Sequence, residues 1–169
     1  MFHSSKITDL KKILEEQGVV LDFSESTSFT YPFNNSTITN IGVIDCRSCN
    51  ALSYLFYSAT CVENVDKVIV SEKNTYSSTA FYDMKKLENI RFEGVIAATI
   101  NIQWSPKMNA ESAKSIIKCL ANYLGTGNAD VNTLSLSNNT WALLDAEGAT
   151  SPNGNTWREY VFDMGWRIT

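Results

Sequence analysis

A recurring aliphatic pattern constrains the fold more than any other feature of this sequence. The spacing aliphatic-x-x-aliphatic-x-aliphatic occurs at Ile38/Ile41/Val43, Val65/Val68/Val70, Leu87/Ile90/Phe92 and Val131/Leu134/Leu136. Random placement of these residue types would give roughly two or three such matches, so their phase is more informative than their number. The starts differ by 27, 22 and 44 residues. A period of 22, with 44 as its double, lies within the range of about 20–29 residues that is typical of leucine-rich repeats.

The leucine-rich-repeat consensus also places Asn or Cys after each strand, where the side chain bonds backbone groups at the turn. Cys46 and Asn139 occupy this position in the first and last matches, but Lys73 and Val95 occupy it in the other two. Apolar and aromatic residues in 51–59 and 76–84 fit a short helix or turn behind each strand. The pattern therefore predicts an α/β fold: a short, irregular solenoid with a parallel sheet on one face and helices and turns on the other.

The first 36 residues are expected to form an N-terminal cap of one helix and one strand. Residues 4–17 have helical periodicity, with Ser4 or Ser5 as the N-cap and Gly18 as the stop. A strand is expected over 19–23, and residues 24–36 form an irregular connection held by the aromatic cluster 29–33. The first twelve residues are too polar for the apolar region of a signal peptide.

Two further helices are expected in the second half of the chain. Apolar residues in 110–124 recur at the spacing of one helix face, with Asn109 as the natural N-cap. The glycines of 124–128 follow this helix, so they fit a C-cap better than a phosphate-binding loop, which precedes a helix. Residues 157–164 are predicted as a last helix that closes the repeat domain, 37–169.

The residue inventory argues against an enzyme. The single histidine, His3, lies near the chain start, so histidine-based nucleophilic and zinc sites have no basis in this sequence. The carboxylates are scattered without a distinct pair, so a carboxylate-based glycoside hydrolase is a less favoured alternative. The motif Cys46-Arg-Ser-Cys49 is one isolated CxxC, for which buried free thiols are a commoner use than metal or redox chemistry. No catalytic residue, metal or cofactor is expected.

The size and net charge of the chain limit the kinds of partner that it is expected to bind. The 169 residues fit one domain, and 14 basic against 18 acidic side chains leave a net charge of -4. Without a basic block the chain lacks the electrostatic surface that nucleic acids require. No apolar run is long enough to cross a bilayer, so no membrane insertion is expected.

Several short motifs together resemble a known family. They are Leu87-Glu-Asn-Ile-Arg-Phe-Glu-Gly94, Ile100-Asn-Ile102, Ser105-Pro106, Ala110-Glu-Ser112, Thr133-Leu-Ser-Leu-Ser137 and Gly165-Trp-Arg-Ile-Thr169. This order resembles the BspA-like, irregular leucine-rich repeats of bacterial surface proteins and prophages, over residues 37–169. The resemblance implies a non-enzymatic module that is exposed on a bacterial surface or carried in a phage particle, and that recognises a protein or a glycan.

If the strands stack in parallel, the residues between the consensus aliphatics project from the exposed sheet face. The predicted ligand-binding residues are Asn40, Lys67, Ile69, Ser71, Asn89, Arg91, Glu93, Asn101, Gln103 and Trp104, with Gly42, Thr133, Ser135 and Ser137 on the same face. The plain alternative is a solvated face without a ligand. A different class of function also fits the sequence: a structural module that self-associates within a phage particle or surface complex.

Overall fold

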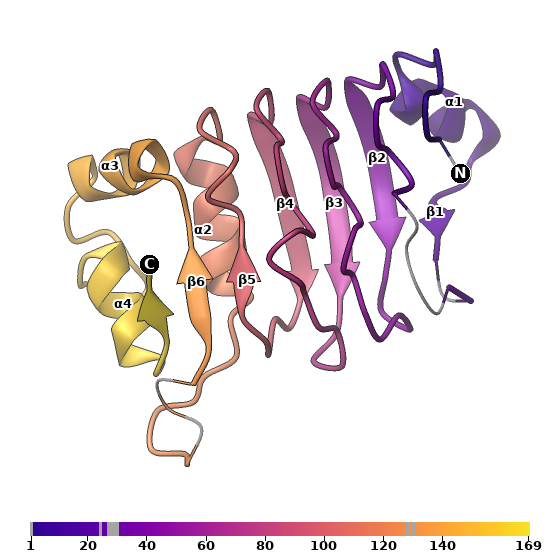
Figure 1. Ribbon diagram of the computed structural model, residues 1–169. Helices are drawn as coiled ribbons and strands as arrows, with labels where there is room; N and C mark the ends of the chain where they lie inside the picture. The colour runs from indigo at the N-terminus through magenta and orange to yellow at the C-terminus, as the bar shows by residue number, and fades with distance from the viewer. Residues whose placement is uncertain (1, 24, 27–30, 128, 130) are drawn as a thin grey trace.

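The strands follow one another along the length of the molecule in the computed structural model, which describes residues 2–23, 25–26, 31–127, 129 and 131–169, and the strands of its two sheets point in opposite directions (Figure 1). A four-stranded parallel sheet has the order β1-β2-β3-β4, and a three-stranded parallel sheet has the order β5-β6-β7. Their bounds are β1 Leu21–Asp22, β2 Asn40–Asp45, β3 Asn64–Val70, β4 Asn89–Gly94, β5 Ile100–Asn101, β6 Thr133–Ser135 and β7 Arg167–Ile168. The prediction of an α/β protein with parallel strands is confirmed. The prediction of a single sheet was wrong, because the strands form two sheets.

The strands of the first sheet bury one side, but β2 and β3 carry one residue more than β4 between their buried positions. Val65 and Val68 of β3 pair with Ile90 and Phe92 of β4, so the register shifts by one residue between them. Such a bulge changes which side chains point inward. In β2 it is Ile44 that is fully buried, while Val43 is only half-buried. The predicted inward position of Val43 was therefore wrong.

Helix α1 (Leu10–Gln17) covers one end of this sheet. Its N-cap is Asp9, whose carboxylate accepts from the Lys12 N–H, and not Ser4 or Ser5 as expected; the predicted stop at Gly18 is confirmed by its left-handed backbone. The Lys11 Cα lies 3.6 Å from the place that a Cβ at Gly42 would take, so the helix packs directly on β2. Gly42, predicted to be exposed, is buried for this reason.

The strand predicted over 19–23 is shorter, because β1 contains only Leu21 and Asp22. Val19 and Val20 are half-exposed and precede it. Of the predicted aromatic cluster, Tyr31 to Phe33 are described, with Pro32 and Phe33 buried, and Phe29 lies outside the described residues.

Helix α2 (Ala110–Lys118) covers the other edge of the sheet beside β4. The predicted N-cap, Asn109, is confirmed, since its side chain accepts from the Ser112 N–H. Two helix hydroxyls then accept from edge amides of β4: Ser112 Oγ from the Ile90 N–H at 2.9 Å, and Ser115 Oγ from the Phe92 N–H at 2.6 Å. The helix thereby takes the place that a further strand would occupy.

The predicted continuation of α2 to residue 124 was wrong. The helix ends at the Cys119 C-cap, and Leu124 is 67% exposed. Leu120 pairs instead with Ile96 in an isolated parallel bridge, which draws the chain out of the helix. The glycine loop therefore does not cap α2; its residue 128 lies outside the described part.

Helices α3 (Asn138–Ala146) and α4 (Trp157–Asp163) lie at the end of the molecule opposite α1 (Figure 1). Helix α4 was predicted, and a capping box between Thr156 and Glu159 starts it. Helix α3 was missed: Ser137 is its N-cap, and Asn139 lies in its first turn rather than in a turn after a strand. Val131, expected to be buried, is 64% exposed.

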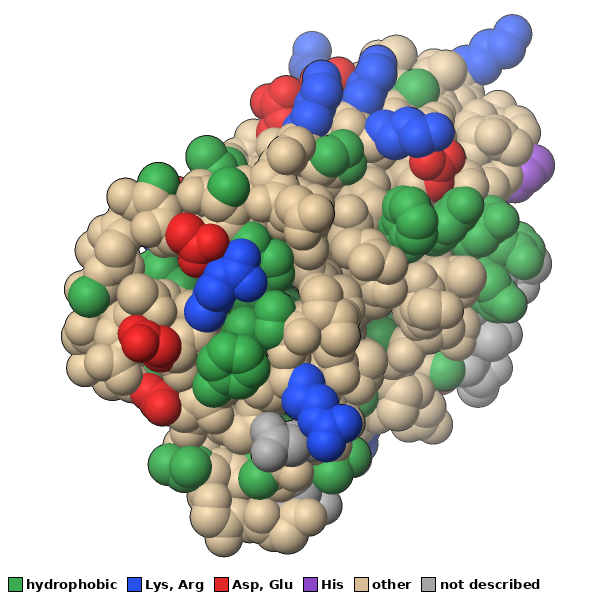
Figure 2. Space-filling model, turned by 60° about the vertical axis from the view of Figure 1, so that its left-hand side comes forward, with side chains coloured by type: hydrophobic (Ala, Val, Ile, Leu, Met, Phe, Trp, Pro, Cys, Tyr) green, Lys and Arg blue, Asp and Glu red, His purple; other side chains and the backbone are tan. Residues whose placement is uncertain are grey.

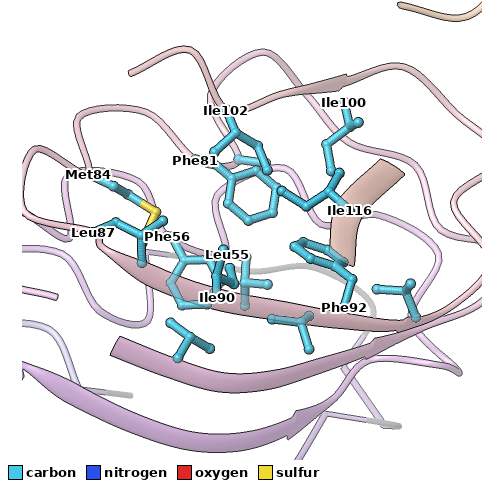
Figure 3. Close-up of a cluster of buried hydrophobic side chains, with 14 of the residues drawn as sticks. Leu55, Phe56, Phe81, Met84, Leu87, Ile90, Phe92, Ile100, Ile102 and Ile116 are labelled. Atoms are coloured by element: carbon cyan, nitrogen blue, oxygen red, sulfur yellow. The ribbon is translucent and has the colours of Figure 1, made fainter. Parts of the chain in front are cut away.

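The core is one continuous cluster that extends from Leu10 to Trp166. The segments behind the strands are turns, and their phenylalanines form a buried row with Phe92 of β4 (Figure 3). Ring centroids are 5.4 Å apart for Phe33 and Phe56, 5.6 Å for Phe56 and Phe81, and 6.0 Å for Phe81 and Phe92. This row runs across successive strands, so that the ring contacts stabilise the packing of each strand and turn on the next.

Candidate binding groove

An open groove of about 910 Å³ lies between α1 and α2, with β2, β3 and β4 as its floor. Its walls come from the first turns of both helices, because each helix begins beside an outer strand of the floor. The lining residues are Asp9, Lys11, Lys12, Glu15, Asn40, Val43, Asn64, Val65, Asp66, Lys67, Asn89, Ile90, Arg91, Asn109, Glu111 and Ser112.

A ladder of carboxamides crosses one end of the floor. The Nδ2 of Asn109 donates to Asn89, that of Asn89 to Asn64 at 2.7 Å, and that of Asn64 to Asn40 at 2.8 Å. The ladder ends where Asn40 Nδ2 donates to the Asp9 carboxylate at 3.3 Å. Since Asp9 and Asn109 are the N-caps of α1 and α2, the ladder joins both walls through the first residue of each strand. We call these five residues the amide ladder.

The amide ladder was not predicted, although the sequence contains a signal for it. Asn40, Asn64 and Asn89 each directly precede a buried aliphatic residue. Successive members stand 24 and 25 positions apart in the sequence. The repeat pattern rests on the aliphatic positions alone and expects Asn only after each strand. The signal for the ladder is instead the Asn that directly precedes a buried aliphatic residue in each of the three strands.

Most charges of the groove are paired. Lys11 contacts Asp66 at 3.0 Å, and this hydrogen bond and charge raise the pKa of Lys11. Lys67 on β3 contacts Glu93 on the neighbouring strand β4 at 2.6 Å. The Lys114 ammonium contacts Glu111 at 2.7 Å and lowers the pKa of that carboxyl.

Arg91 differs from the other cations of the groove. It is exposed on the floor, and its guanidinium forms no ion pair or hydrogen bond within the described part of the chain. Its charge adds to that of Lys114 in lowering the pKa of Glu111. The groove thus contains one guanidinium that is free to meet an anion.

The structure brings four of the predicted ligand-binding residues together in the groove: Asn40, Lys67, Asn89 and Arg91. Glu93 lies next to them through its ion pair with Lys67. Ile69 is half-buried on β3, and the Ser71 hydroxyl donates to the Arg47 carbonyl, so both lie towards the end of β3 away from the ladder.

The predicted residues of the second sheet do not line the groove. Asn101 accepts from the Gln103 N–H in the turn after β5. Ser135 and Ser137 are buried and hydrogen-bonded, contrary to their predicted exposure, because Ser135 pairs with Thr169 and Ser137 caps α3. Thr133 is half-buried on β6.

Trp104 is 46% exposed, and its ring meets that of Tyr82 edge-on at 5.4 Å. Tyr82 stacks in turn on Tyr57, so these rings form an outer row on the turns behind the strands. In Figure 2, exposed hydrophobic side chains gather below a group of Lys and Arg side chains. Tyr82 is 37% exposed, so its ring and that of Trp104 remain accessible, and neither of them lines the groove. The other tryptophans are buried.

The chemistry-bearing residues outside the groove are dispersed. His3 is exposed, and its ring contacts the neighbouring Ser4 hydroxyl. Cys46 and Cys49 are free and buried; Cys49 donates to the Phe23 carbonyl, and the pKa of Cys46 is raised by its contact with Cys49 and by burial. Among the residues that the structure describes, no three His, Cys, Asp or Glu side chains are placed to hold a metal ion.

The fold and the groove define an α/β protein with parallel sheets and a mixed-charge surface groove. Comparisons with protein-family models, with curated proteins and with solved structures gave no match. Within the described ranges, none of the helices has the length and apolar character needed to cross a membrane.

Proposed function

We propose that the protein is a short, irregular leucine-rich-repeat solenoid of the BspA-like kind. Support comes from the first sheet, in which β2, β3 and β4 follow one another in sequence and in space, with ladder residues 24 and 25 positions apart. That spacing fits the period of about 20–29 residues of this repeat class. Turns in place of helices behind the strands, and helices at both ends, fit the irregular and capped character of the proposed solenoid.

We further propose that the protein is a non-enzymatic recognition module, exposed on a bacterial surface or carried by a phage particle, that binds a protein or glycan in the groove. The observation that carries this proposal is the convergence of Asn40, Lys67, Asn89 and Arg91 on one hollowed floor with an unpaired guanidinium. A concave site with a few oriented polar groups is the usual form of a binding site.

The test is binding of the labelled chain to an array of bacterial and mucosal glycans and extracellular proteins. The triple variant Lys67→Ala/Arg91→Ala/Glu93→Ala should lose at least tenfold in affinity for any ligand found. The matched control is Glu72→Ala/Lys73→Ala/Lys86→Ala, which removes the same charges from exposed positions outside the groove. Equal affinity of both variants, at equal melting temperature, would refute the groove as the binding site.

Self-association is the second candidate, and an exposed apolar patch at the α1 end favours it. Ile13, Val19 and Val20 are 37%, 50% and 50% exposed there, beside the short edge strand β1. If copies of the chain join through this patch, Val20→Asp should abolish the association. Sedimentation velocity would show this, and a strictly monomeric wild-type chain at high concentration would exclude it.

A further inference from the structure

We infer that the groove binds an extended polypeptide segment and that Arg91 receives a carboxylate side chain of that segment. This inference rests on the proposed recognition function and specifies its ligand. Three observations lead to it: the remaining hydrogen-bonding capacity of the amide ladder, the unpaired Arg91 guanidinium, and the chemical character of the lining.

The amide ladder presents a row of fixed donors and acceptors. Each of Asn40, Asn64 and Asn89 uses one N–H and one oxygen lone pair within the ladder. A carboxamide has two N–H donors and two lone pairs, so one of each remains. The ladder also fixes which way each amide points, which reduces the entropy lost on binding. One donor and one acceptor per amide match the N–H and C=O of a peptide bond.

The length of the row suits a short extended segment. Neighbouring ladder residues stand on neighbouring strands, which lie about 4.8 Å apart in a sheet. Residues of an extended polypeptide rise about 3.3 Å each, so a segment of about four residues spans the three strands of the floor.

Arg91 supplies the charge preference. The other groove cations are engaged: Lys11 by Asp66, Lys67 by Glu93, and Lys12 by Glu16 at 3.9 Å. A planar guanidinium matches a carboxylate in a two-bond arrangement. Because Asp9, Glu15 and Glu111 also line the groove, the floor accommodates one carboxylate beside Arg91 and not a polyanion.

The lining favours a peptide over a glycan. None of the described residues that line the groove is aromatic, whereas a sugar ring is commonly held by stacking on an aromatic face. Of the aliphatic residues that line the groove only Val43 is accessible, because Val65 and Ile90 are buried beneath the floor. The surface offered to a ligand therefore consists mainly of amide and charged side chains, which suit the backbone and an acidic side chain of a peptide.

The experiment uses the full chain and an array of eight-residue peptides whose central residue is Asp, Glu, Asn, Gln or Lys. Flanking positions are varied among Ser, Thr and Val, which favour extended structure. The wild-type chain should bind the Asp or Glu peptides at least tenfold more tightly than their Asn or Gln counterparts. Arg91→Gln should remove this preference, while the control Arg167→Gln, at an exposed arginine outside the groove, should keep it.

A charge reversal separates recognition from structural damage. Arg91→Glu should lose the acidic peptides and gain the Lys peptides, a result that a misfolded groove could not give. Persistence of the acid preference in Arg91→Gln would overturn the inference. Binding of glycans but of no peptide would also overturn it while leaving the recognition function intact, and silence of both arrays would count against both proposals.

Discussion

Gly94 is the single residue that allows the close approach of β4 to the end of β3. Its backbone has φ +108°, and a Cβ there would lie 2.0 Å from the Val70 carbonyl oxygen, opposite it in β3. We expect Gly94→Ala to lower the free energy of unfolding by at least ~2 kcal/mol, from backbone strain and from separation of the strands. Urea denaturation measures this loss.

The control for this prediction is Gly125→Ala. Gly125 also has a positive φ, +73°, but no atom lies within 4 Å of the added Cβ. Only the backbone cost of about 1 kcal/mol should appear there. Equal losses in the two variants would show that the close approach of β3 to β4 does not limit residue 94.

A second single residue, Asp45, makes the free energy of unfolding depend on pH. Arg47 donates to both carboxylate oxygens, at 3.0 and 3.1 Å from Nε, and lowers the pKa of Asp45. A carboxyl whose pKa is lower in the folded than in the unfolded state stabilises the fold above its unfolded pKa, near 3.8, and this contribution is lost as the pH falls.

The unfolding free energy of the wild type should therefore fall more steeply between pH ~5 and pH ~3 than that of Asp45→Asn. Urea denaturation at both pH values compares them. Glu72→Gln, at an exposed carboxyl that forms no ion pair within the described residues, should keep the wild-type slope. Identical slopes for wild type and Asp45→Asn would contradict the prediction.

At the scale of elements, α2 replaces a strand at the edge of the first sheet. The Ser112 and Ser115 hydroxyls accept the amide protons of Ile90 and Phe92. Their loss leaves two edge amides without a protein acceptor, at a cost of about 1–3 kcal/mol each when buried. Ser112→Ala/Ser115→Ala should therefore destabilise the chain, with the larger share from the buried bond at Ser112.

Thermal unfolding with each single variant apportions this effect. Ser78→Ala, at an exposed serine, should leave the melting temperature nearly unchanged. Ser115→Thr should retain most of the stability, because it keeps the hydroxyl. A wild-type melting temperature in the double alanine variant would show that α2 does not complete the edge of β4 in this way.

Elements with strong local signals could be predicted from the sequence, and those decided by tertiary contacts could not. The start of α2 at Asn109 was predictable because the cap residue and the apolar spacing agree. Its end was not, because the bridge from Leu120 to Ile96 overrides the continuing apolar pattern. The direction of Val43 depends on a bulge between strands, which no pattern within one strand reveals.

The candidate groove was predictable in part for the same reason. Alternation along β4 correctly placed Asn89 and Arg91 on the exposed face. The packing of α1 on Gly42 and the divergence of the second sheet from the first were beyond any local pattern. These two features decide which predicted residues meet in the groove and which lie elsewhere.

The whole molecule depends on one core that runs through both sheets. The buried cluster is continuous from Leu10 to Trp166, and the phenylalanine row crosses the boundaries between strands. Small proteins with one continuous core usually unfold in a single cooperative transition. The groove, which needs both α1 and α2, then forms only when the whole chain is folded.

Two probes in opposite halves of the chain test whether the molecule unfolds in one cooperative step. All four tryptophans lie in residues 104–166, so their fluorescence reports the second half. Cys46 and Cys49 are buried in the first half, so their reaction with a thiol reagent reports its opening. In a Cys61→Ser/Cys119→Ser background, which leaves only these two thiols, both signals should change at the same urea concentration. Separate midpoints would show that the first sheet and the second unfold independently, and the groove could then form without the α3–α4 end.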